Sequence, residues 1–207
     1  MKKISHSFVL FTVATALSCT AAVAQPAAQT SFTGLGLGAN LSFVKNSMEL
    51  SSGVSDLAKN STEVALTAGY GYALGKDWVG TLGLSLGLKN SDYATYMPSS
   101  ENSTATAKEH ISIHIAPGYR VGNDGLVYGK LAMHQMRVNY VTTTAGFDVT
   151  KTHQGTGVGI GYAHALTPSL EFSVEYETVK FDSQNVTASG TAQPQQGNLN
   201  IGLAYKF

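Results

Sequence analysis

His110 and Ser112 are the residues in this sequence whose types and spacing come nearest to nucleophilic chemistry. In a β-strand, alternate residues lie on the same face, so these two side chains would be neighbours. A serine nucleophile needs a base within hydrogen-bond reach and an acid that orients the base. Glu109 is adjacent in sequence, but on a strand it points to the other face. Any two polar residues at alternate positions of a strand share a face in this way, so the pairing is not specific to catalysis. We therefore predict no catalytic residue.

The histidines do not predict a metal site. His6 belongs to the N-terminal segment, while His153 and His164 lie on segments other than that of His110. No tight ligand spacing of the kind that zinc sites use is present. The sequence also lacks a phosphate-binding loop and a basic, aromatic patch. We therefore expect no metal, no cofactor and no nucleic-acid partner.

The amino-acid composition indicates which class of fold positions these residues. Only 13% of the 207 residues are charged, whereas soluble domains have about 25%. Lys plus Arg and Asp plus Glu balance at 13 each, which gives no argument for a polyanionic partner. Glycine is frequent, at 22 residues, and no stretch after residue 24 is apolar enough for a spanning helix. Together these features favour a β-barrel in lipid.

The first 24 residues are predicted to be a signal peptide. Lys2 and Lys3 precede an apolar stretch at 8–17, and Ala22-Val23-Ala24 is a small-x-small cleavage site, so cleavage is expected between Ala24 and Gln25. A retained anchor helix and a lipoprotein box at 16–19 are the alternatives. The predicted domains are thus a signal peptide, 1–24, and a barrel, 25–207. Cleavage would remove Cys19, the only cysteine, and with it any disulfide.

An apolar residue recurs at every second position in eight segments, which predicts eight strands. The segments are 35–43, 64–72, 82–88, 111–119, 127–133, 158–162, 170–176 and 199–207. Short turn sequences at 75–77, 122–125 and 167–169 alternate with long polar connections at 45–62, 89–109, 139–153 and 180–195. This asymmetry is typical of outer-membrane barrels. We therefore predict an all-β, eight-stranded, antiparallel up-and-down transmembrane barrel with both termini at the short-turn side.

The polar face of these strands is predicted to line the barrel interior. It consists mostly of Gly, Ala, Ser and Thr, whereas a solvated exterior would carry many more charges. On the apolar, lipid-facing side, aromatic residues form two sets flanking an aliphatic middle, as at two membrane interfaces. The set near the short turns is Tyr70, Tyr72, Trp78, Tyr119, Tyr162, Phe172, Tyr205 and Phe207. The set near the long connections is Phe43, Tyr93, Tyr96, Tyr140, Tyr176 and Phe181.

Several ionisable residues fall on the inward face. They are His110, His114, Arg120, Lys130, His134, Glu171, Glu175 and Glu177, with Ser173 between two of the glutamates. Because an unpaired charge in a narrow lumen is costly, we predict a network of Arg120 and Lys130 with Glu171 and Glu175. The network either bridges the strands and plugs the lumen or forms a gated conduction path by exchanging partners.

The last ten residues, 198–207, resemble the terminal strand of bacterial outer-membrane proteins. Leu203, Tyr205 and Phe207 share one face and the chain stops on Phe. The resemblance implies that these residues are the insertion signal read by the barrel-assembly machinery. The alternative, compatible role is to anchor the last strand at the interface.

The whole mature chain resembles the small eight-stranded barrels of the OmpA/OmpX and opacity-protein type, with 126–131 and 170–176 similar to their middle strands. This resemblance implies a place in the bacterial outer membrane. The expected partners are outer-membrane lipid and lipopolysaccharide, the barrel-assembly machinery, and host or environmental surface ligands bound through the loops.

The implied function is non-enzymatic and serves envelope integrity, surface adhesion or host interaction. A narrow porin-like channel for small solutes is the alternative. A lipid A-modifying enzyme is the third, since His110-Ile111-Ser112 resembles the His-x-Ser pair of lipid A deacylases.

Overall fold

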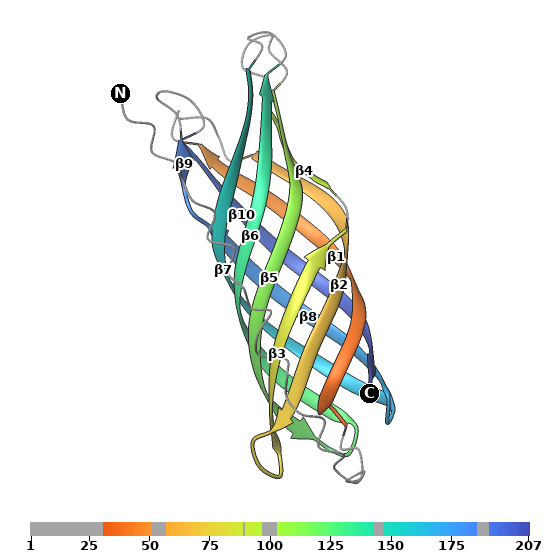
Figure 1. Ribbon diagram of the computed structural model, residues 1–207. Helices are drawn as coiled ribbons and strands as arrows, with labels where there is room; N and C mark the ends of the chain where they lie inside the picture. The colour runs from red at the N-terminus through yellow and green to blue at the C-terminus, as the bar shows by residue number, and fades with distance from the viewer. Residues whose placement is uncertain (1–30, 51–56, 89, 97–102, 143–146, 186–190) are drawn as a thin grey trace, which may run out of the picture.

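The protein forms one closed antiparallel sheet in a computed structural model that describes residues 31–50, 57–88, 90–96, 103–142, 147–185 and 191–207 (Figure 1). Its first strand pairs with both the second and the last strand, so the sheet closes on itself. In these ranges, no helix has the length and apolarity to cross a membrane. The predicted signal peptide and its cleavage site at Ala24 and Gln25 lie outside the described residues.

The strand segments assemble into eight walls. The described segments are β1 (Gly34–Leu50), β2 (Leu57–Ala73), β3 (Trp78–Gly87), β4 (Ser91–Tyr96), β5 (Ser103–Val121), β6 (Gly125–Thr142), β7 (Phe147–Thr167), β8 (Leu170–Phe181), β9 (Gln184–Asn185) and β10 (Thr191–Lys206). β3 and β4 both pair with β5, while β8 and β9 both pair with β10, so each of these two pairs forms a single wall. The predicted eight-stranded, all-β barrel is confirmed.

The strands are steeply tilted, as Figure 1 shows. The cross-strand register defines a path once around the barrel that leaves β1 at Leu35 and returns to it at Lys45, ten residues further along the chain. The path runs through Tyr70, Leu82, Ile115, Leu131, Val158, Thr178 and Gly197. This stagger corresponds to a tilt of about 40° and an interior wide enough only for side chains.

Three tight turns lie at one end of the barrel, called here the turn end, as the sequence predicts. They connect β2 to β3, β5 to β6 and β7 to β8. Gly75 and Gly122 have positive φ angles of 148° and 68°, a backbone conformation that favours glycine at such turns. β1 begins and β10 ends at this end, where Gly36 pairs with Lys206.

At the opposite end, called the loop end, the strands are longer than predicted. The ranges 45–62, 89–109, 139–153 and 180–195, expected to be loops, are largely strand, since β1 continues to Leu50 and β7 already begins at Phe147. The remainder of these ranges includes 51–56, 97–102, 143–146 and 186–190, which lie outside the described residues. Apolar residues stop alternating where the outward side chains leave the lipid, but the strands continue to pair beyond that point. Periodicity alone therefore predicted strands that are too short at the loop end.

The outward face carries a continuous belt of exposed apolar side chains, as expected for the lipid-facing side. Toward the loop end, the belt stops at Phe43, Val64, Leu88, Ile111, Met133, Val158, Tyr176 and Leu199. The next outward residues are polar or small, such as Lys45 after Phe43 and Thr178 after Tyr176. Residues beyond this edge stand outside the hydrocarbon core.

The belt differs in height around the barrel. Along β3 and the residue that follows it, the outward positions of the belt run from Trp78 to Leu88, whereas on β8 they run only from Leu170 to Tyr176. In the strand order these two walls are opposite each other. The upper edge of the belt is therefore lowest around β8.

The aromatic set at the turn end is exposed as predicted, apart from a half-buried Phe172. At the loop end, Phe43 and Tyr176 face outward, but the placement of Tyr140 and Phe181 on the lipid side was wrong. Tyr140 is 8% exposed and Phe181 is 1% exposed, because each occupies an inward position of its strand. The side chains of Tyr93 and Tyr96 lie outside the described residues.

Candidate functional site in the barrel lumen

Two apolar clusters occupy the lumen of the barrel, one near each end. The loop-end cluster consists of Met48, Ala105, Ala107, Met136, Val138, Tyr140, Val179, Phe181 and Ala192. The turn-end cluster consists of Phe32, Val79, Leu126, Ala163 and Ala165, with Tyr128 packed against it. Sequence reasoning missed the loop-end cluster because all of its residues fall outside the eight predicted strand segments. Counting alternate positions onward from the inward His134 would have found Met136, Val138 and Tyr140.

Between the clusters, Lys130 on β6 binds two carboxylates of β8. Its Nζ lies 2.8 Å from Oε1 of Glu175 and 3.2 Å from Oε2 of Glu177. These three side chains are all less than a tenth exposed. Asn200 of β10 also donates to Oε1 of Glu175, at 2.9 Å. The predicted partners Lys130 and Glu175 are thus adjacent, and Glu177 is a further member of the network.

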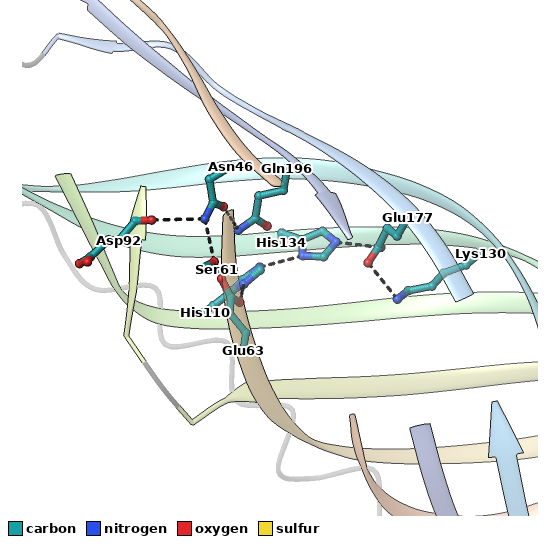
Figure 2. A network of polar contacts seen from close by, with 9 residues as sticks. All are labelled: Asn46, Ser61, Glu63, Asp92, His110, Lys130, His134, Glu177 and Gln196. Carbon is teal, nitrogen blue, oxygen red and sulfur yellow. Dashed lines mark hydrogen bonds and ion pairs between the residues drawn. The ribbon is translucent and has the colours of Figure 1, made fainter. Parts of the chain in front are cut away.

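A pair of histidines extends this network across the lumen (Figure 2). His134 Nε2 lies 3.1 Å from Oε1 of Glu177, and its Nδ1 lies 3.0 Å from Nε2 of His110. The other ring nitrogen of His110 is 3.8 Å from Oε2 of Glu63 on β2. Side chains from β6, β8, β5 and β2 therefore form one chain of polar contacts from Lys130 to Glu63. Glu63 was missed, although it occupies an inward position of its strand.

A layer of amides lies above the histidines in the same polar region. Asn46 donates to Ser61 Oγ at 2.9 Å and accepts from Gln196 at 3.2 Å. Asn46 is fully buried. These contacts tie β1 to β2 and β10, close to the seam where the barrel closes (Figure 2).

Glu171 and Arg120, the other two members of the predicted network, form no ion pair with each other within the described part of the chain. Glu171 Oε2 lies 3.6 Å from Nζ of Lys206, which stands on the neighbouring strand β10. The guanidinium carbon of Arg120 lies 5.6 Å from the ring centroid of Phe32 at the turn end. Arg120 is on β5, three walls away from β8, so Lys206 is the nearer cation. Alternation back from Phe207 places Lys206 inward.

Two small polar cavities flank the central ion pairs. One of about 150 Å³ is lined by Asn40, Glu171 and Ser173 among others. The second, of about 60 Å³, is lined by Glu63, His110 and Ser112 among others. His114 and Lys130 line both cavities. Buried polar atoms without a protein hydrogen bond, such as Glu63 Oε1 and His114 Nδ1, are suited to bind water there.

The His110–Ser112 pair is not arranged as a base and its nucleophile. Both side chains are on the lumen face, with Ser112 6% exposed, and the ring nitrogens of His110 face His134 and Glu63. Glu109 points outward and binds Arg137 at 3.0 Å. Across the described ranges, no three His, Cys, Asp or Glu side chains gather closely enough to hold a metal ion.

His153 forms a separate polar site on β7, beyond the apolar belt. Its side chain is fully buried, with Nε2 2.8 Å from the Tyr140 hydroxyl and Nδ1 3.0 Å from the backbone oxygen of Asp182. Burial lowers the pKa of His153, and the contacts with Asp182 oppose that shift. On β7 the apolar belt begins only at Val158, which is nearer the turn end than His153. This site is therefore in the extension of the barrel outside the lipid.

The three residues of the predicted insertion signal all face outward at the C-terminal end of β10. Leu203, Tyr205 and Phe207 are 52%, 52% and 63% exposed. The rings of Tyr205 and Phe207 meet edge to face, with centroids 5.1 Å apart. Their role as a signal stays a prediction.

Comparisons with known proteins agree with this architecture. The structure of Ail, the attachment invasion locus protein of Yersinia pestis, in complex with the heparin analogue sucrose octasulfate, aligns with a TM-score of 0.52 at 13% identity, over 84% of this chain and 100% of that chain. Neisserial surface protein A aligns with a TM-score of 0.56 at 18% identity, over 84% and 98%. No curated protein matches the chain.

The family model described as outer membrane protein beta-barrel domain matches residues 12–207. Together with the closed sheet and the apolar belt, this match establishes the bacterial outer membrane as the location. The chain therefore belongs to the outer membrane protein β-barrel domain family.

Proposed function

We propose that this protein is a non-enzymatic, non-conducting outer-membrane barrel that supports the envelope and presents a binding surface to the outside. The observation that carries the proposal is the filling of the lumen by side chains. An apolar cluster lies near each end of the lumen, and the Lys130–Glu175–Glu177 network lies between them.

Opening a path through this lumen would be costly at two levels. Phe181 and Met136 are almost fully buried in the loop-end cluster, so an ion would have to displace close-packed apolar side chains. Below them, separating Lys130 from its carboxylates would leave buried charges without partners. Side chains fill an interior of this width, which supports a structural role for the network.

The part of the protein that meets the surroundings is the extended wall beyond the apolar belt. Polar outward residues such as Gln135, Thr152 and Thr178 cover it. The Ail structure was solved with a sulfated sugar that is a heparin analogue. We propose sulfated glycans of a host surface as the first class of ligand to test on this wall.

Planar-bilayer recording of the refolded protein tests the closed lumen. We expect no discrete openings from the unaltered protein or from Glu175→Gln, because the loop-end cluster is intact in both. A Phe181→Ala, Lys130→Ala, Leu126→Ala triple variant weakens the loop-end cluster, the central network and the turn-end cluster together, and should produce openings. Discrete openings of the unaltered protein that Glu175→Gln changes would instead establish the narrow channel.

Binding of folded protein to immobilised heparin, competed with sucrose octasulfate, tests the surface function. Saturable binding that the sugar displaces would support adhesion, whereas the absence of binding at low salt would contradict this class of ligand. The enzyme alternative predicts modified lipid A in cells that express the protein, and loss of that modification in His110→Ala or Ser112→Ala.

A further inference from the structure

A groove on the outward face of β8, β10 and β1 combines cations with hydroxyl groups directly above the apolar belt. Its floor is Gly197 of β10, whose partners on the neighbouring strands are Lys45 and Thr178. Lys180 and Gln195 form the next outward-facing cross-strand pair toward the loop end. We call these five residues the headgroup groove.

The absence of a side chain at Gly197 creates the hollow. Two concavities, of about 540 Å³ and about 440 Å³, meet at Gly197 and Lys45. The first reaches down to Phe43, Tyr176 and Leu199 in the apolar belt. A Cβ at position 197 would lie 3.2 Å from the hydroxyl oxygen of Tyr176, so that hydroxyl leans over the floor of the groove.

The barrel stagger brings the two lysines to nearly the same height above the membrane. Phe43 and Tyr176, the last belt residues on β1 and β8, are both partners of Leu199. Lys45 is two residues beyond Phe43, and Lys180 is four beyond Tyr176. The barrel stagger of ten residues over eight walls shifts paired residues by a little over one residue in height per wall. Tyr176, two walls from Phe43, is therefore between two and three residues lower than Phe43. The two extra residues between Tyr176 and Lys180 nearly compensate for this difference. With standard strand spacing, their Cα atoms are about 12 Å apart.

The local charge favours an anion. Neither lysine has a carboxylate partner among the described residues, and the outward positions of β8 and β10 described here carry no Asp or Glu. The nearest carboxylates on these walls are Asp182, two residues beyond Lys180, and Glu49 on β1. Both bind other donors: Asp182 accepts hydrogen bonds from the backbone N–H of Gln154 and from the Gln184 amide, and Glu49 Oε1 accepts one from Gln195 at 2.6 Å. Lysine ammonium groups and hydroxyls are suitable donors for phosphate oxygens.

We propose that the headgroup groove binds the phosphorylated headgroup of an outer-leaflet lipid, with an acyl chain along Phe43, Tyr176 and Leu199. Short turns of outer-membrane barrels face the periplasm, so this edge of the belt meets the outer leaflet. Continuity of the groove with the belt selects a lipid as the occupant rather than free phosphate. The proposal does not depend on whether the lumen conducts.

Native mass spectrometry of the folded protein in a non-ionic detergent tests the site with bis-phosphorylated lipid A as the probe. Each lysine near an anionic surface strengthens binding by about fivefold, so Lys45→Gln with Lys180→Gln should weaken it by about 25-fold. Lys108→Gln, an exposed lysine on β5 at the same end, is the matched control and should bind as the unaltered protein does. A heat-modifiable gel shift verifies folding of every variant.

Gly197→Val tests the shape of the groove without changing its charge. Its side chain would fill the hollow beside Tyr176, and lipid A binding should fall about tenfold or more. Equal binding by the double lysine variant and the control would overturn the proposal, as would equal binding of dephosphorylated lipid A. Displacement of the lipid by millimolar inorganic phosphate would overturn the lipid as occupant.

Discussion

Lys130 Nζ and Glu175 Oε1 lie 2.8 Å apart in the middle of the barrel, with both side chains less than a tenth exposed. Glu177 completes the charge arrangement at 3.2 Å, so one cation faces two carboxylates. His134 Nε2 lies 3.1 Å from the other oxygen of Glu177, Oε1, so each oxygen of that carboxylate has its own partner. The centre of the lumen is consequently sensitive to the loss of a single positive charge.

Lys130→Met should destabilise the barrel by about 3–5 kcal/mol, because it leaves Glu175 and Glu177 buried without their cation. Urea unfolding in lipid vesicles measures the change. Lys76→Met, at an exposed turn, is the matched control and should have little effect. Glu175→Gln should cost less than Lys130→Met, since glutamine still accepts hydrogen bonds from Lys130 and Asn200. Equal stability of Lys130→Met and the control would disprove the importance of the pairing.

Phe181→Ala should lower the free energy of unfolding by about 3–5 kcal/mol, the usual cost of emptying a buried phenylalanine site. Phe172→Ala on the same strand is the control, because that ring is half-buried on the outward face. The same urea titration compares the two variants. A smaller loss for Phe181 than for Phe172 would contradict an apolar seal at the loop end.

The extension outside the lipid should lose stability in mild acid because of His153. Burial lowers its pKa in the folded protein, so below about pH 6.5 the unfolded chain binds a proton that the folded chain does not. Stability from the neutral ring is complete above pH 6.5 and falls as the pH drops toward the lowered pKa. Denaturant midpoints between pH 8 and pH 5 should decline more steeply for the unaltered protein than for His153→Asn. Parallel pH profiles would contradict this linkage.

Phe207→Ser and Tyr205→Ser distinguish an insertion signal from an interfacial anchor. If the aromatic residues are read during assembly, both variants should reach the outer membrane poorly in cells, yet fold in detergent at nearly the normal rate and yield. Tyr70→Ser, an aromatic change at the same end of the barrel, supplies the comparison. Equal losses in cells and in detergent would favour the anchoring role.

Alternation of apolar residues was sufficient to predict the strand number, the turn end and the lipid-facing belt. The period of two reports lipid contact, so it could not mark where β1 or β7 ends outside the membrane. Tyr140 and Phe181 were misplaced for the same reason, because aromatic type was given more weight than their inward positions. Alternation could not predict that Lys206 rather than Arg120 is the cation near Glu171. The choice depends on which strands are neighbours and on their register, and neither can be read from alternation alone.

The uneven belt has a consequence for the membrane itself. The belt spans ten residue steps on the β3 wall, from Trp78 to Leu88, but only six on β8, from Leu170 to Tyr176. A bilayer of uniform thickness cannot match both walls at once, so the barrel must lean or the bilayer must thin beside β8. The first and last strands join next to that wall. The seam of the barrel therefore borders a wall of short apolar height, where the barrel must lean or the bilayer must thin.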